Sequence, residues 1–167
     1  MDGRSEIEGI LRRSLTAFVH HVRDTGWWGK EREAVNYYAL GFLLKECLPG
    51  SVLFDPAQLA IESRVGQIEK PKGKNEVCKD LAIWPGPGQG CWDAHRKSSR
   101  YPLVIMEWKV NTERIFAYDR DWLLAFSTDK PDFTGVCLSM NMLDQRPTLN
   151  ASMIQDGKET LEWLLIR

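Results

Sequence analysis

Cysteine and histidine are scarce in this sequence, and they are spaced too widely to form a zinc site. The four cysteines are scattered, none belongs to a C-x-x-C pair, and two of the three histidines are adjacent. Zinc modules require closely spaced pairs of these residues, so the sequence excludes a zinc finger. We interpret the cysteines as free thiols, which predicts a reducing, cytoplasmic location.

The sequence also lacks long apolar runs and a strong excess of charge of either sign. No stretch approaches the roughly 20 apolar residues that a membrane span requires, and the charged N-terminus is unlike a secretory signal. We therefore expect no membrane partner. The formal net charge of −1 disfavours a protein that coats nucleic acid non-specifically, but it allows a local basic patch.

What the sequence does contain is typical of one globular domain. Its 167 residues are 43% hydrophobic and 27% charged, which is enough to build a single core. Apolar residues recur at helical spacing over residues 5–24, 30–48 and 113–128, and strand-like runs occupy residues 59–65, 81–84, 101–110 and 135–142. Residues 151–166 are either a hairpin that turns at Asp156 and Gly157, which we favour, or a segment that closes with a short helix. This order predicts an α/β (α+β) domain that spans residues 1–167.

The stretch over residues 101–110 carries two charges in a strand that is otherwise apolar. Side chains alternate along a strand, so Glu107 and Lys109 are expected on one face, while Met106 and Trp108 are expected on the other. An acid and a base on such a strand are costly unless they are paired or bind a metal. This pattern makes Glu107 and Lys109 candidate functional residues.

Asp80 opens the preceding apolar run, Leu81-Ala-Ile-Trp84. If this strand runs antiparallel to the strand over residues 101–110, its start lies beside the end of its neighbour. Asp80 would then lie next to Glu107 and Lys109. Two carboxylates and a lysine at one place in a sheet predict a site for a hard cation and for phosphodiester chemistry.

A polar segment over residues 66–79 is expected to form a hairpin loop at the same end of the sheet. Its positive bias comes from Lys70, Lys72, Lys74 and Lys79. A solvated turn is the simpler interpretation of these lysines. Their expected position near Asp80, however, makes them candidate contacts to a nucleic-acid backbone.

The order of elements, Asp80, and the tripeptide Glu107-Trp108-Lys109 together resemble the PD-(D/E)XK nuclease superfamily, whose fold is called restriction-endonuclease-like. The resemblance implies an α-β-β-β-α-β core over about residues 29–142, with a central mixed sheet flanked by helices and an extra N-terminal helix. Residues 29–34 are also similar to the first-helix segment of archaeal Holliday-junction resolvases, which selects Glu31 over Glu33 as a further acidic ligand. Lys79 stands where the family often has proline.

The resemblance implies a metal-dependent endonuclease that hydrolyses phosphodiester bonds, with DNA as the favoured substrate. Asp80, Glu107, Glu31 and the main-chain carbonyl of Trp108 would bind Mg²⁺ or Mn²⁺, and Lys109 would orient the attacking water and stabilise the transition state. Many nucleases of this size act as dimers, which makes a homodimer a further expectation. The alternative is a catalytically inactive domain of the same fold that binds nucleic acid or a protein partner.

Overall fold

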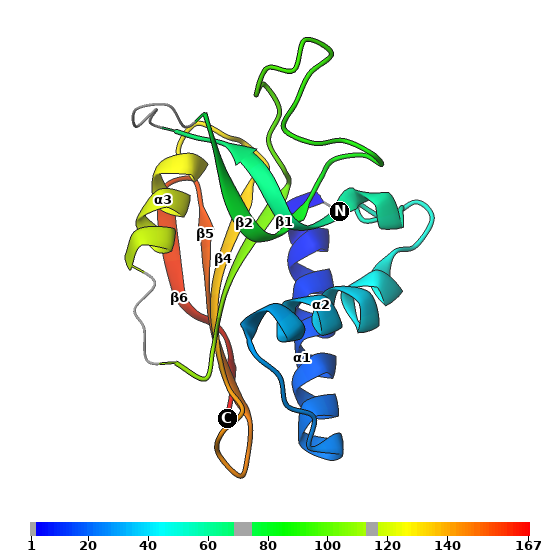
Figure 1. The fold of residues 1–167 in the computed structure, drawn as a ribbon, viewed down its shortest axis with the longest axis vertical. Coiled ribbons are helices and arrows are strands. Elements are labelled where there is room, and N and C mark those ends of the chain that lie inside the picture. Colours follow the sequence, from blue (N-terminus) through cyan, green and yellow to red (C-terminus); the bar gives the residue numbers. More distant parts are fainter. Residues whose placement is uncertain (1–2, 69–74, 113–116) are drawn as a thin grey trace.

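The protein is a mixed α/β domain in which helices flank a six-stranded sheet (Figure 1). The computed structural model describes residues 3–68, 75–112 and 117–167. None of the helices in these ranges combines the length and the hydropathy that crossing a bilayer requires. The elements, in chain order, are α1 (Gly3–Thr25), α2 (Glu31–Gly41), the 3₁₀ helices η1 (Leu43–Glu46) and η2 (Pro56–Gln58), β1 (Leu59–Gly66), β2 (Glu76–Ile83), β3 (Val104–Val110), α3 (Ala117–Ser127), β4 (Thr134–Asn141), β5 (Thr148–Gln155) and β6 (Lys158–Ile166).

The strands lie side by side in sequence order, and β3 and β4 are the one parallel pair among them. A parallel pair needs a crossover connection, and α3 lies within the connection between β3 and β4. The other neighbours are antiparallel and follow one another directly. The expected mixed sheet flanked by helices is therefore confirmed.

The two faces of the sheet are covered by different helices. Val104, Met106 and Trp108 of β3 pack with α1 and α2 in the larger core cluster, whereas Ile105 packs with Trp122 of α3 in a second cluster. In Figure 1, α1 and α2 lie on one side of the sheet and α3 on the other. The alternation predicted for β3 is confirmed, and it directs Glu107 and Lys109 away from the α1 core.

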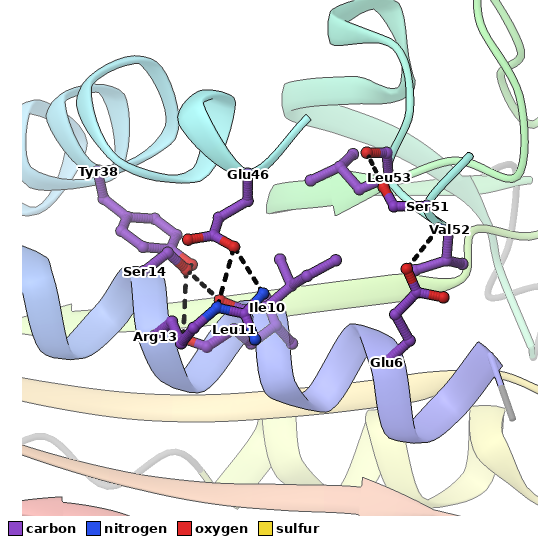
Figure 2. Close-up of polar contacts among 10 residues, drawn as sticks. All are labelled: Glu6, Ile10, Leu11, Arg13, Ser14, Tyr38, Glu46, Ser51, Val52 and Leu53. Carbon is purple, nitrogen blue, oxygen red and sulfur yellow. Dashed lines mark hydrogen bonds and ion pairs between the residues drawn. The ribbon is translucent and has the colours of Figure 1, made fainter. Parts of the chain in front are cut away.

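The long helix α1 holds α2 in place through buried and surface contacts. The Ser14 hydroxyl of α1 lies 2.8 Å from the Tyr38 hydroxyl of α2, and the guanidinium of Arg13 pairs at 2.7 Å with Glu46 of η1, which follows α2. Figure 2 shows both contacts. The ring of Tyr38 also packs on that of Trp108, with centroids 5.2 Å apart. These contacts hold α2 between α1 and β3, and in its first turn Glu31 lies 3.8 Å from Lys109 of β3.

Element boundaries differ from the sequence-based prediction in several places, among them the start of β3 at Val104 rather than at residue 101, whereas the C-terminal hairpin is confirmed. Strand β2 begins at Glu76 rather than at residue 80, so residues 76–79, which were expected in the loop, belong to the strand. Helix α2 ends at Gly41 and is followed by the separate 3₁₀ helix η1. Strands β5 and β6 pair around Asp156 and Gly157, whose φ angles are 51° and 70°. Positive φ at both positions is typical of a type I′ hairpin turn.

Each edge strand of the sheet carries one glutamate in the left-handed conformation. Glu62 in β1 has a φ of 52° and Glu162 in β6 has a φ of 49°. The register of β6 against β5 also shifts between Ala151 and Met153. Both outer strands therefore depart from regular extended geometry near their middle.

Candidate functional site

Strands β2 and β3 separate at the place where the sequence predicted a site. Their ladder pairs Leu81, Ala82 and Ile83 with Met106, Ile105 and Val104. At the residue before Leu81, the carboxylate of Asp80 accepts a hydrogen bond from the backbone N–H of Trp108 at 2.8 Å. The backbone N–H of Trp108 thus donates to a side chain, whereas in a regular ladder it would donate to a backbone carbonyl of the neighbouring strand. The opening between the strands contains Asp80, and Glu107 and Lys109 belong to the segment of β3 that borders it.

Glu107 lies on the α3 side of β3 in a buried ion pair with Lys79. The ammonium of Lys79 is 2.6 Å from Oε1 of Glu107, and the side chains are only 1% and 5% exposed. The same ammonium lies 4.0 Å from the ring centroid of Trp122 and 4.0 Å from Oδ1 of Asp119, both in α3. Lys79 is therefore an interior residue whose charge is balanced by acids and by an aromatic face.

The structure therefore corrects the expected role of Lys79. A residue this deeply buried belongs to no surface patch that a nucleic-acid backbone can contact. It is internal because β2 begins before it and turns its side chain under α3. The other three lysines of the predicted cluster, Lys70, Lys72 and Lys74, lie outside the described residues.

Lys109 extends between two helices that cover opposite faces of the sheet. Its ammonium donates to the carbonyl oxygen of Trp108 at 2.8 Å. It also lies 3.8 Å from Oε1 of Glu31 at the start of α2, and 3.7 Å from Oδ2 of Asp119 near the start of α3. Lys109 thus contacts residues of three elements, and its side chain is 20% exposed.

The structure distinguishes the two glutamates in the first turn of α2, of which the resemblance selected Glu31 over Glu33. Glu31 lines a hollow of about 100 Å³ together with Asp80 and Glu62. Glu33 instead accepts the backbone N–H of Lys30 at 2.8 Å and caps the helix. A capping carboxylate is already occupied at its own helix terminus. The structure therefore places Glu31, and not Glu33, beside Asp80.

The carboxyl groups of the site influence one another electrostatically. Burial raises the pKa of Glu107 to about 8, and Asp80 and Asp119 add to this rise while Lys79 opposes it. Burial likewise raises the pKa of Glu31, again with contributions from Asp80 and Asp119 and with Lys109 opposing. The ionised form of a crowded, buried carboxylate is costly, and a nearby cation stabilises that form.

The site contains carboxylate and carbonyl oxygens, which are the ligand types of hard divalent cations. In the described ranges, no three acidic, histidine or cysteine side chains converge closely enough to hold a metal ion. Two of the expected oxygen ligands nevertheless already contact a cation, because Lys79 lies on Glu107 and Lys109 lies on the carbonyl of Trp108. These oxygen atoms are of the kind that Mg²⁺ and Mn²⁺ prefer, but in the described part of the chain they are not gathered into a metal-binding group.

Asp119 is a site residue that the sequence did not indicate. An acid in the first turn of a helix normally interacts only with the helix dipole, and nothing local marks Asp119 as different. The crossover between β3 and β4 brings it within 4.0 Å of both Lys79 and Lys109. The one available signal was its place in the first helix after the Glu-x-Lys strand.

Comparison with known proteins gave no relative from which a role could be carried over. No family model, curated protein or solved structure matches this chain. The assignment of a function therefore depends on the residues and the geometry of the site described above.

Proposed function

We propose that the protein is a metal-dependent nuclease that hydrolyses phosphodiester bonds in DNA. The observation that carries the proposal is the separation of β2 and β3, which leaves Asp80 bound to the backbone of β3 between Glu107 and Lys109. The order α2, β1, β2, β3, α3 and β4 also agrees with the α-β-β-β-α-β core that the resemblance implies.

Asp80, Glu31, Glu107 and the carbonyl of Trp108 are the groups that would hold Mg²⁺ or Mn²⁺. All four are hard oxygen donors, which these ions prefer over nitrogen or sulfur. When bound, such an ion would polarise the scissile phosphate and lower the pKa of a coordinated water. The protein's contribution is to place the donors on rigid strands and on a helix whose first turn is fixed by packing.

Lys109 is the residue that we assign to the reaction itself. Its ammonium lies between Glu31 and Asp119 and is anchored on the main chain of β3. A positive charge held there would orient a water and stabilise negative charge on the phosphate in the transition state. Its anchoring on acids from two helices keeps the ammonium in place before any substrate arrives.

One observation favours the alternative, an inactive domain that binds nucleic acid or a protein partner. Glu107 is neutralised by a buried lysine at 2.6 Å, and an ion pair of this kind can be purely structural. The two functions differ in their need for a metal, so the same set of variants separates them.

The test combines Mn²⁺ titration with cleavage of plasmid DNA. The wild-type protein should bind Mn²⁺ and cleave, Asp80→Ala should lose both activities, and Lys109→Met should bind Mn²⁺ but lose cleavage by about 10³-fold. Lys45→Met is the matched control, because Lys45 lies on η1 against the ring of Phe42 and far from the proposed site in sequence. DNA or protein binding without metal, unaffected by Asp80→Ala, would replace the nuclease proposal by the inactive alternative.

A further inference from the structure

A hollow lined by basic and hydroxyl side chains lies at the end of α3 opposite to Asp119. Its volume is about 170 Å³, and its walls come from the end of β1, from the loop that joins β2 to β3, and from the end of α3 with the turn that follows. Arg100 and Lys130 supply positive charge, and Ser98 and Ser99 supply hydroxyl groups. Among the described residues, no aspartate or glutamate lines it. The hollow therefore suits an anion rather than a cation.

The loop that joins β2 to β3 (Figure 1) approaches the end of β1 at a glycine. A Cβ added at Gly66 would overlap with Oγ of Ser98, so only glycine leaves room for this hydroxyl. The backbone N–H groups of Ser99 and Arg100 donate to the carbonyl of Cys91, at 3.0 and 3.3 Å. These contacts fix the main chain of residues 98–100 at the hollow.

Gln67 adds a hydrogen-bond donor that is held by α3. Its Oε1 accepts the indole N–H of Trp122 at 2.6 Å, and an indole nitrogen can only donate. The amide oxygen is thus used inside the protein, which leaves the NH₂ group, a donor, for a ligand. Lys130 is held in a similar way, since its ammonium lies 4.1 Å from the ring centroid of Phe126. Both donors are therefore positioned before a ligand arrives.

The two cations of the hollow are only weakly compensated. In the part of the chain that the structure describes, neither Arg100 nor Lys130 forms an ion pair with a carboxylate. The acid that interacts with Arg100 is Asp93, which does not line the hollow. Its pKa is lowered mainly by a hydrogen bond from the backbone of Lys97, and Arg100 makes a smaller contribution. An anion in the hollow would meet positive charge that the protein does not itself neutralise.

Phosphate is the anion that best fits these groups. The planar guanidinium of Arg100 can hold two phosphate oxygens at once, and the ammonium of Lys130 adds a point charge. The NH₂ group of Gln67 is a further donor, and a carboxylate offers only two oxygens to share among them. Pockets for drug-sized ligands have volumes of roughly 300 Å³ or more. The smaller hollow suits one phosphate group rather than a whole nucleotide.

We propose that this hollow, lined by Gln67, Arg100 and Lys130, binds a phosphate group of a nucleic-acid backbone. The source of the phosphate rests on the proposed function and on the position of the hollow along α3. Asp119 and Phe126 lie about two turns apart on one face of this helix, which is about 10 Å along its axis. One DNA strand places a phosphate about every 3.4 Å along the duplex axis. The hollow would thus hold the strand about three nucleotides from the phosphate that reacts.

The experiment is an NMR titration of ¹⁵N-labelled protein, with a chelator present and no metal added. Sodium phosphate and a short single-stranded DNA are the probes, and sodium chloride at equal ionic strength is the blank. We expect phosphate to shift the backbone amide signals of residues 98–100 saturably. Arg100→Met should weaken this binding at least about tenfold, because it removes charge-assisted hydrogen bonds.

Arg96→Met is the matched control, since Arg96 is exposed in the same loop and does not line the hollow. It should bind phosphate as wild type does. Lys130→Met tests the same site from another element and covers the case in which Arg100→Met fails to fold. Equal shifts with sodium chloride, or unchanged phosphate binding in Arg100→Met or Lys130→Met, would overturn the inference.

The DNA titration distinguishes a backbone phosphate from free phosphate. DNA that shifts the same signals and displaces inorganic phosphate supports the proposal in full. Phosphate binding that DNA does not displace would overturn the nucleic-acid part and leave a site for free phosphate.

Failure of this inference can be separated from failure of the proposed function, because the titration contains no metal. Phosphate and DNA binding at residues 98–100, in a protein that neither binds Mn²⁺ nor cleaves DNA, would refute the nuclease alone. Cleavage that depends on Lys109, with no phosphate shift at residues 98–100, would refute this inference alone.

Discussion

The carboxylate of Asp80 accepts the backbone N–H of Trp108 at 2.8 Å, so an acid of β2 holds the main chain of β3 where the ladder between the two strands has ended. Trp108 is completely buried, and its N–H must find an acceptor inside the protein. Asp80 therefore has a structural task in addition to the proposed metal-binding one. The two tasks can be separated by choosing the substitution.

We expect Asp80→Asn and Asp80→Ala to differ in stability but not in metal binding. The asparagine side chain keeps an oxygen that can accept the N–H of Trp108, whereas alanine leaves that donor unsatisfied at a cost of roughly 1–3 kcal/mol. Neither variant retains the carboxylate. Urea unfolding should show a loss for Asp80→Ala alone, while Mn²⁺ titration should show lost affinity for both; equal stability of the two variants would contradict the structural role.

The two glutamates in the first turn of α2 provide a second matched pair. Glu31→Ala should weaken Mn²⁺ binding at least about tenfold, because Glu31 shares a hollow with Asp80. Glu33→Ala should leave Mn²⁺ binding unchanged and lower the free energy of unfolding by about 0.5–1 kcal/mol, since it removes the cap on Lys30. Titration and thermal unfolding of both variants check this, and the reverse pattern would assign the metal ligand to Glu33.

The stability of the metal-free protein should depend on pH through Glu107. Burial raises the pKa of Glu107 to about 8 from an ordinary 4.5, so between these values the folded state keeps a proton that the unfolded state releases. The contribution of the protonated Glu107 carboxyl to the free energy of unfolding is present in full below about pH 4.5. It is lost as the pH rises through about 8, and the free energy of unfolding then falls by at most about 1.4 kcal/mol per pH unit.

The control for this pH dependence is Glu107→Gln, which cannot titrate at this position. Urea unfolding from about pH 5 to pH 8, with a chelator present, should show wild-type stability falling relative to the variant as the pH rises. Parallel curves for the two proteins would show that Glu107 titrates near its ordinary value in the folded state.

The hairpin turn between β5 and β6 gives a test of the fold alone. Gly157 has a φ of 70°, and an added Cβ would lie 3.1 Å from Oγ1 of Thr128. Gly157→Ala should therefore lower the free energy of unfolding by about 1–2 kcal/mol. Gly90→Ala is the matched control, because an added Cβ at Gly90 meets nothing within 4 Å; an equal effect of both substitutions would argue against a strained turn.

Much of the architecture could be predicted from local patterns. The apolar run of β3 and the Asp-Gly turn of the last hairpin are strong signals, and the antiparallel pairing of β2 with β3, which the prediction of the site required as a condition, is observed. This pairing is also what brings Asp80 next to the segment that carries Glu107 and Lys109. The candidate site was predictable to the extent that neighbouring strands define it.

What could not be predicted depends on partners that are distant in sequence. Lys79 lies in a polar segment and suggests a surface loop, yet Glu107 and Trp122 allow it to be buried. Asp119 has the appearance of an ordinary residue in a first helical turn, and only the crossover of α3 brings it to the lysines. Tertiary contacts, rather than local preference, determine the positions of both residues.

The left-handed glutamates of the two outermost strands have a consequence for how the protein behaves at high concentration. An extended edge strand offers unpaired backbone groups to any second chain, and regular geometry over several residues is needed for such docking. Glu62 and Glu162 interrupt that geometry near the middle of β1 and β6 and add a charge to each. Neither margin of the sheet therefore provides an uninterrupted template for intermolecular β-pairing, which protects the folded protein against edge-to-edge aggregation.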